Sequence, residues 1–443
     1  MNRRVFLAAG TAALAGCDAV YSSLAGRLSG GVPMTFARPE GQAVDPDVFL
    51  LRRATFGPAP GDLDRLRAVG RNAWLDEQLH PERIDDTACG ILVRRFESLR
   101  MTPGDLFEFK REVAEDEIAR ATLLRAVYSR RQVYEALVEF WSDHFNVFQG
   151  KGDCAWLKTA DDRDVVRRHA LGRFRDLLRA SALSPAMLVY LDGRENHKAK
   201  PNENYARELL ELHTLGVHGG YTQADVMEVA RCLTGWDVKR GWFKGQVRFH
   251  PERHDDGPKR VLGVDLPAGG GEKDLDRVLD IVCAHPSTAR YVAGKLCRRF
   301  VADDPPRAVV DRVAARFTAT GGDLRETARE VLKAVEPGPV RFKRPFRFVV
   351  SALRGLAATT QGKRPVRRFL ERMGQAPFQY PTPDGYPDEP EPWMGTLLWR
   401  WTFALELAQG RVDDVKIGLP LGSREDLFAH LVGRRPSETE KAA

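Results

Sequence analysis

The chain has 443 residues, of which 68 are Lys or Arg, 61 are Asp or Glu and 43% are hydrophobic, and its formal net charge is +7. This hydrophobic share is ordinary for a globular protein and excludes disorder over most of the chain. The length is enough for one large core without disulfide staples. The small positive excess comes without a basic run interleaved with aromatics and without finger-type Cys/His spacing, so nucleic acid is not an expected partner.

The first 17 residues have the build of an export signal. Two arginines precede an apolar run over residues 5–15, which is shorter than the roughly 20 residues that span a bilayer. Residues 2–7, NRRVFL, resemble the twin-arginine pattern. Residues 14–17, LAGC, resemble a bacterial lipobox. We therefore expect export to the periplasm or cell envelope, with a lipid on Cys17 as membrane anchor. A plain secretory signal cut nearby is the alternative.

The rest of the chain is dominated by helical periodicity. Residues 18–45 are rich in Gly, Ser, Ala and Pro and predict a flexible tether. From residue 46 onward, apolar residues recur at i, i+3 and i+4 spacing. The predicted helices cover residues 46–55, 60–69, 71–79, 105–148, 162–180, 184–191, 202–216, 222–234, 273–284, 286–302, 307–318, 322–335, 342–360, 365–373 and 393–409. Thr222 with Asp225 predicts a capping box, and Asp323 is an N-cap candidate.

Two stretches interrupt this pattern. Residues 241–263 predict a short β-hairpin with a polar tip, and residues 374–392, rich in Pro and Gly, predict an ordered irregular loop. Neither break is long enough to demand a domain boundary. The predicted fold is mainly α, a single large multi-helix domain over residues 46–430 with one short β-hairpin insertion. Residues 431–443 are expected to form a polar tail.

One histidine stands in the middle of an apolar helical face. At about 100° per residue, His144 shares a face with Phe140 and Trp141. One interpretation is a core histidine that makes a single hydrogen bond. The other is a histidine in a pocket wall, next to Asp143, whose pKa is tuned by burial and by a carboxylate partner.

A second cluster is polar. Asn204, Arg207, Glu208 and Glu211 occupy positions i, i+3, i+4 and i+7 of a predicted helix, so they form one stripe. The stripe fits an ordinary solvated, salt-bridged face. It also fits two carboxylates, one turn apart beside an arginine, that bind a divalent metal or divide acid and base roles. The sequence identifies no other cofactor.

Two more residues are candidates for substrate binding. Arg231 is a second guanidinium that can face the same site. His254 lies in the polar tip of the predicted hairpin, and its spacing from His250 is one that zinc ligands use. Pro251 interrupts a helix there and no second ligand pair is evident, so a polar loop tip is the default interpretation. The motifs of serine hydrolases, P-loop proteins and zinc proteases are absent from the sequence.

A series of motifs resembles one bacterial family. The motifs are LLRRATFG at 50–57, FWSDHF at 140–145, NYARELLELHTLG at 204–216, LTGW at 233–236, HPSTAR at 285–290, KRP at 343–345 and MGQ at 373–375. They are similar, in the same order, to those of the domain-of-unknown-function 1800 family over about residues 46–410. The resemblance implies a mainly helical, often exported protein. It carries over no catalytic residues, and it implies an exported protein of the domain-of-unknown-function 1501 (DUF1501) family as a partner.

Two functions follow from these observations. The first is a hydrolase or modifying enzyme acting outside the cytoplasm on a cell-envelope or carbohydrate-type substrate. Its candidate catalytic residues are His144, Asp143, Glu208, Glu211 and Arg207, and its candidate substrate-binding residues are Trp141, Asn204, Arg231 and His254. The second is a non-catalytic, lipid-anchored envelope scaffold that binds another exported protein, with an exposed apolar patch and a polar stripe that is only solvated.

Overall fold

The structure, a computed structural model, describes residues 18, 20–240, 244–339, 341–419 and 422–442. The predicted export signal and Cys17 lie outside the described residues. The described chain is mainly helical and forms a single domain, so the predicted fold class is confirmed. No helix in this part of the chain combines the length and apolarity needed to cross a membrane.

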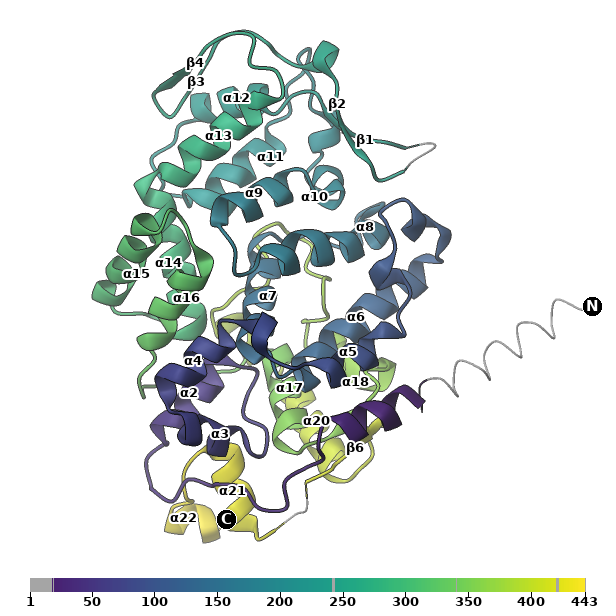
Figure 1. The fold of residues 1–443 in the computed structure, drawn as a ribbon, viewed down its shortest axis with the longest axis vertical. Coiled ribbons are helices and arrows are strands. Elements are labelled where there is room, and N and C mark those ends of the chain that lie inside the picture. Colours follow the sequence, from purple (N-terminus) through teal and green to yellow (C-terminus); the bar gives the residue numbers. More distant parts are fainter. Residues whose placement is uncertain (1–17, 19, 241–243, 340, 420–421, 443) are drawn as a thin grey trace, which may run out of the picture.

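Helices from both ends of the chain form the lower part of the molecule in Figure 1. They are α2 (Pro46–Ala54), α3 (Asp62–Val69), α4 (Arg71–Gln78), α5 (Thr87–Arg94), α17 (Pro345–Gly355), α18 (Arg364–Arg372), α19 (Glu391–Met394), α20 (Leu397–Ala408), α21 (Arg424–Val432) and α22 (Glu438–Ala442). Asp45 caps α2 by accepting hydrogen bonds from the amides of Asp47 and Val48.

The middle of the molecule holds α7 (Gln132–His144) and the elements around it (Figure 1). These are α6 (Arg111–Tyr128), α8 (Cys154–Asp161), the π-helical segment η4 (Asp162–Arg167), α14 (Pro286–Phe300), α15 (Arg307–Ala319) and α16 (Leu324–Lys333). The predicted helix over residues 105–148 is broken between α6 and α7. The main hydrophobic core runs through this region, and Phe140, Trp141 and Phe145 are among its largest fully buried side chains.

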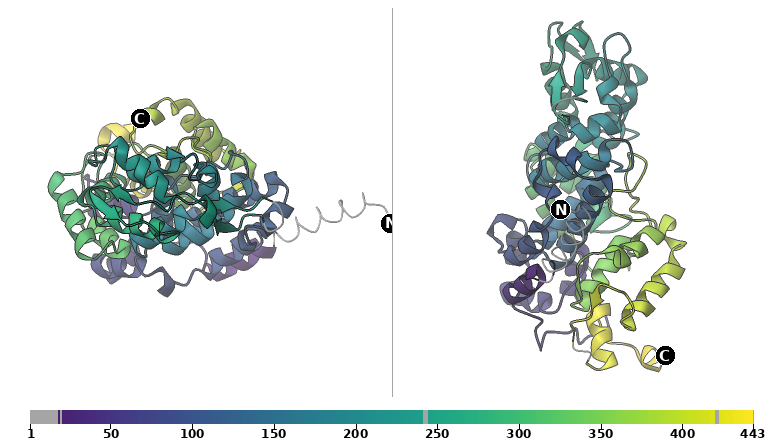
Figure 2. Two further views of the ribbon diagram at one scale, coloured as in Figure 1. Left: turned by 90° about the horizontal axis from the view of Figure 1, so that it is seen from above. Right: turned by 90° about the vertical axis from the view of Figure 1, so that its right-hand side faces the viewer.

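The upper part carries the polar stripe. Its elements are α9 (Phe174–Ala182), α10 (Pro185–Tyr190), α11 (Glu203–Glu208), the π-helical segment η6 (Leu209–Thr214), α12 (Gln223–Cys232) and α13 (Lys273–Ala284). Figure 2 shows an elongated molecule, with this part at one end and the C-terminus at the other.

Two β-hairpins stand where one was predicted. The strand β1 (Trp236–Val238) pairs with β2 (Val247–Phe249), and β3 (Lys259–Val261) pairs with β4 (Val264–Leu266). Leu262 and Gly263, both with positive φ, make the tight turn between β3 and β4. Gly263, which was expected to end the one predicted hairpin, therefore lies in the turn of a second hairpin. A third two-stranded sheet joins β5 (Thr359–Thr360) to β6 (Val415–Lys416).

The terminal segments are held against the domain. Residues 20–28 are helical, and the Asp18 carboxylate lies 2.9 Å from Arg95 and 3.6 Å from Arg120. This part of the predicted flexible tether is therefore docked by ion pairs that composition alone does not reveal. In the predicted polar tail, the Arg435 amide donates to the Gly41 carbonyl at 2.8 Å.

Candidate functional site: a carboxylate cluster beside a π-helical turn

The polar stripe lies on α11 and on η6, which continues it. Asn202 caps α11, and its side chain accepts a hydrogen bond from the Asn204 amide at 2.9 Å. The helix then widens, and the Thr214 hydroxyl donates to the Leu209 carbonyl, five residues back, at 2.6 Å. Single π-helical turns occur frequently at functional sites.

A loop from the other end of the chain reaches this stripe. It is the Pro- and Gly-rich connection between α18 and α19. The Asn146 side-chain amide donates to the carbonyls of Tyr380 and Thr382 at 3.0 and 2.7 Å. The Tyr190 hydroxyl donates to the Pro381 carbonyl at 2.7 Å. Hydrogen bonds from α10 and from the segment that follows α7 therefore fix the course of the loop.

Glycine is required at one position of this loop. Gly385 has a φ of 76°, and a β-carbon there would lie 2.1 Å from the carbonyl oxygen of Asp143. Only a residue without a side chain permits both the backbone conformation and the close approach to the end of α7. The approach places Asp384, the preceding residue, where its charge acts on Glu208.

Glu208, Glu211 and Asp384 form the carboxylate cluster. Burial raises the pKa of Glu208, and the negative charge of Glu211 raises it further. Arg207 opposes that shift, whereas Asp384 adds to it. A carboxylic acid with a raised pKa keeps its proton closer to neutral pH, which is the property of a general acid.

Two tyrosines and a lysine complete the surroundings of this cluster. The Tyr221 hydroxyl donates to Glu211 Oε2 at 3.2 Å. Burial raises the pKa of Tyr291 to about 12, and the charges of Glu211 and Asp384 act in the same direction. The Lys295 ammonium lies 5.5 Å from the centre of the Tyr291 ring, and burial lowers its pKa to about 8. Proton donors and acceptors of different strength therefore gather at one place.

His144 and Trp141 lie in the aromatic core. His144 is 1% exposed, and its Nε2 lies 3.0 Å from the carbonyl oxygen of His213. Burial holds the pKa of His144 well below its ordinary value. Trp141 Nε1 donates to the Ala170 carbonyl at 3.1 Å. Within the described residues, His144 makes no hydrogen bond to the carboxylates of the polar stripe; it contacts η6 through the His213 carbonyl, and its ring centre lies 6.2 Å from that of Tyr291.

Asp143 faces a different set of groups. Its carboxylate lies 2.8 Å from the guanidinium of Arg299 and 2.8 Å from that of Arg344. Both arginines are almost completely buried. Asp143 therefore belongs to a buried ion-pair network that joins α7, α14 and the start of α17.

Arg207 and Asn204 lie at the edge of the cluster. Arg207 Nη2 donates to Glu203 at 2.9 Å and to Gln223 at 2.8 Å, which ties α11 to α12. Asn204 is exposed, and its side-chain amide donates to Asp192 at 3.3 Å. The structure thus keeps Arg207 close enough to act on the pKa of Glu208 while its hydrogen bonds serve to hold two helices together.

Arg231 and His254 hold the connection between the two hairpins against α12 and α13. Arg231 pairs with Asp255 at 2.7 Å and with Glu228 at 2.8 Å. His254 is buried, and its Nε2 lies 3.3 Å from Asp274 Oδ2. Their contacts are accounted for by these neighbours rather than by the carboxylate cluster.

Sequence patterns missed four residues of the site, Tyr221, Tyr291, Lys295 and Asp384. For Lys295 the sequence does contain a signal, because this lysine lies between Val292 and Leu296, two residues on the buried face of α14. As for a divalent metal, the described residues include no group of three or more His, Cys, Asp and Glu side chains arranged to hold one.

The fold and the site together define a mainly helical, single-domain protein with a carboxylate cluster on a π-helical turn. The chain belongs to the family described as "Protein of unknown function (DUF1800)", whose model matches residues 49–443. The resemblance found in the sequence is therefore confirmed, and the match extends into the predicted polar tail. Comparisons with curated proteins and with solved structures find no match.

Proposed function

We propose that this protein is a hydrolase or modifying enzyme that acts outside the cytoplasm on a cell-envelope or carbohydrate-type substrate. The observation that supports it is the carboxylate cluster, in which the pKa of Glu208 is raised by burial and by the charge of Glu211. Titratable groups whose environments push their pKa values apart are the pattern of acid and base catalysis. Glycoside hydrolysis uses a carboxylate pair of this kind.

In this proposal Glu208 is the general acid, which gives its proton to the leaving oxygen of the substrate. Glu211, held by the Tyr221 hydroxyl, is the base that takes a proton from the attacking water. Asp384 keeps the local charge negative and so helps Glu208 retain its proton. His144, neutral behind Tyr291, is a positioning residue.

Replacing Glu208 by glutamine is expected to lower product formation roughly hundredfold or more, because the amide cannot donate the proton. The measurement is release of reducing ends or amino groups from purified peptidoglycan and envelope polysaccharides by the full-length protein. Glu203→Gln is the matched control, since Glu203 lies on the same helix and its side-chain contacts, among the residues that the structure describes, are with Arg207 and Gln223. Absence of product with the wild-type protein on every polymer, or full activity of Glu208→Gln, would contradict the proposal.

We propose as a second candidate a non-catalytic, lipid-anchored envelope scaffold that binds another exported protein, such as one of the DUF1501 family. It is supported by an apolar stripe on α19 and α20 whose members are each more than half exposed: Met394, Leu397, Leu398, Trp401 and Leu405. Patches of this kind mark interaction sites. The Glu208→Gln variant separates the two candidates. Intact capture of the DUF1501-family protein with an intact cellular phenotype favours the scaffold, whereas lost activity with intact capture favours the enzyme.

Both candidates include export and a lipid on Cys17, for which the sequence of residues 1–17 is the support. Cells grown with labelled palmitate are expected to incorporate the label into the wild-type protein and to retain it in the membrane fraction. Cys17→Ala should abolish the label, while Cys89→Ala, which alters a buried free thiol, should leave it unchanged. Equal labelling of the wild type and Cys17→Ala would rule out the anchor.

A further inference from the structure

A cavity of about 110 Å³ lies on the far side of the Asp143 ion pairs, where α2, α14 and the start of α17 meet. Within the described part of the chain, six arginines and Lys343 line it, against one carboxylate, Asp388. Such an excess of cations around a partly buried space is unfavourable unless negative charge offsets it.

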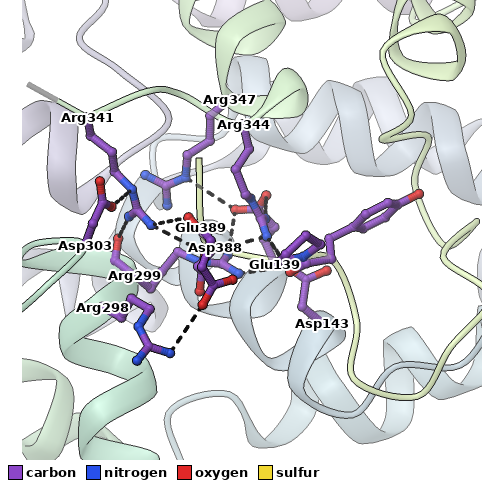
Figure 3. A network of polar contacts seen from close by, with 12 residues as sticks. Glu139, Asp143, Arg298, Arg299, Asp303, Arg341, Arg344, Arg347, Asp388 and Glu389 are labelled. Carbon is purple, nitrogen blue, oxygen red and sulfur yellow. Dashed lines mark hydrogen bonds and ion pairs between the residues drawn. The ribbon is translucent and has the colours of Figure 1, made fainter. Parts of the chain in front are cut away.

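Four of these arginines are balanced by carboxylates, as Figure 3 shows. The closest pairs are Arg299 with Asp388 at 2.6 Å, Arg344 with Glu139 at 2.5 Å, Arg341 with Asp303 at 2.7 Å and Arg347 with Glu139 at 3.5 Å. With Asp143 added, the network holds four carboxylates for four guanidinium groups. The net charge of these four arginines and four carboxylates is therefore zero, and the other cations that line the cavity add to it.

Three cations around the cavity have no carboxylate within ion-pair distance in the described part of the chain: Arg52, Arg53 and Lys343. Their hydrogen bonds go to neutral oxygens: Arg52 to the Leu431 carbonyl, Arg53 to the Pro339 carbonyl at 3.3 Å, and Lys343 to the Ser351 hydroxyl at 2.9 Å. Burial, together with the charges of Arg52, Arg347 and Arg400, lowers the pKa of Lys343 to about 7. The local charge excess is therefore up to three.

Buried donors on the cavity wall are also without a hydrogen-bond acceptor. Arg53 is 7% exposed, and its Nη1 has no hydrogen-bond partner among the described residues. The same is true of Arg347 Nη2 and Arg344 Nε. A buried charged donor without an acceptor costs free energy, so native proteins rarely keep one. These donors, like the uncompensated charges, call for an anionic acceptor in the cavity.

We propose that this cavity binds a phosphate group, either free inorganic phosphate or a phosphate carried on a larger molecule. A phosphate dianion balances Arg52 and Arg53, whereas a monocarboxylate leaves a second arginine uncompensated. Phosphate also offers several oxygens to the unpaired N–H groups, and the planar guanidinium fork matches their geometry. The phosphate site is independent of the carboxylate cluster and does not rest on the proposed enzymatic function.

Calorimetric titration of the phosphate-free, full-length protein with inorganic phosphate, at constant ionic strength, is expected to show saturable binding. Arg53→Gln and Lys343→Gln should each weaken it by about tenfold or more, since each removes a charged donor. Both variants should melt at or above the wild-type Tm without phosphate, because each removes an uncompensated buried cation. Arg312→Gln, which alters an exposed pair with Glu330, is the control and should bind phosphate normally.

Titrations with two further ligands, glycerol 3-phosphate and acetate, identify the source of the phosphate. Tighter binding of glycerol 3-phosphate than of inorganic phosphate assigns the site to a carried phosphate group, and the reverse order assigns it to the free ion. Acetate should bind more weakly than either. Binding no stronger than that of chloride, or equal phosphate affinity in the wild type and both cavity variants, would overturn the proposal.

Discussion

Replacing Arg344 by methionine is expected to destabilise the folded protein by about 3–5 kcal/mol. The guanidinium lies 2.8 Å from Asp143 and 2.5 Å from Glu139, and the side chain is only 3% exposed. Methionine fills a similar space but leaves both carboxylates short of their main counter-charge in a buried place. The cost of burying them is then offset only in part, by Arg299 at 2.8 Å from Asp143 and by Arg347 at 3.5 Å from Glu139. Urea unfolding at neutral pH measures the change in the free energy of unfolding.

The effect of Arg344→Met should reach the carboxylate cluster. Arg344 also donates to the Tyr386 carbonyl at 3.2 Å, and Arg299 holds Asp388 at 2.6 Å. Burial alone would raise the pKa of Asp388, but Arg299 and Arg344 hold it far below its ordinary range. These contacts fix the loop that presents Asp384, so a folded Arg344→Met protein is also expected to have a displaced loop.

Two comparisons isolate the buried charge as the cause. Arg312→Met removes an exposed partner of Glu330 and should cost no more than about 1 kcal/mol. Adding Asp143→Asn to Arg344→Met should restore part of the lost stability, because it neutralises a buried carboxylate that has lost one of its two arginine partners. If Arg344→Met and Arg312→Met unfold at the same urea concentration, the network does not stabilise the fold.

Local interactions were predictable from the sequence. Thr222 and Asp225 form the expected capping box, with each side chain accepting from the backbone of the other. Asp323 caps α16 by accepting from the Glu326 amide at 3.0 Å, also as expected. These contacts span three residues, so the residue types and their spacing determine them. The hairpin region was harder because Leu262, which is not a typical turn residue, adopts a positive φ there.

The candidate site was only half predictable. Helical periodicity predicted that Glu208 and Glu211 lie on one face, because both are on one short stretch of chain. Asp384, Tyr291 and Lys295 reach the same place through tertiary packing, for which a single sequence has no local signal. Periodicity at 3.6 residues per turn also does not predict the π-helical widening at Leu209, since an inserted residue shifts every later position.

The case of His144 shows why a helical face alone does not separate structure from function. The apolar stripe correctly predicted that His144 is inward-facing, and it is 1% exposed. Burial was common to both interpretations of this residue. The contacts that distinguish them, the His213 carbonyl and the Tyr291 ring, come from η6 and α14. They favour a histidine that is neutral at physiological pH and packed behind the site.

A strong loss of stability in mild acid is expected from the two buried histidines. Burial lowers the pKa of His213 to about 3, with the Lys295 charge adding to the shift, and it holds the pKa of His144 well below 6.5. Both groups bind protons less readily when folded than when unfolded. Their contribution is therefore fully present above pH 6.5 and is lost as the pH falls toward the folded-state values. Each of these two histidines should lower the free energy of unfolding by about 1.4 kcal/mol for every pH unit below pH 6.5.

Replacing His213 by phenylalanine should reduce this pH dependence by about 1.4 kcal/mol per pH unit, because one of the two titrating groups is removed. Both ring nitrogens of His213 are without hydrogen-bond partners in the described part of the chain, and its ring centre lies 5.0 Å from that of Phe145, so an apolar ring suits the position. Urea unfolding at pH 7, 6 and 5 measures the slope, above the range in which most paired carboxylates take up protons. His218→Asn, at an exposed position, should leave the slope unchanged. A His213→Phe protein as acid-sensitive as the wild type would show that other groups control unfolding in acid.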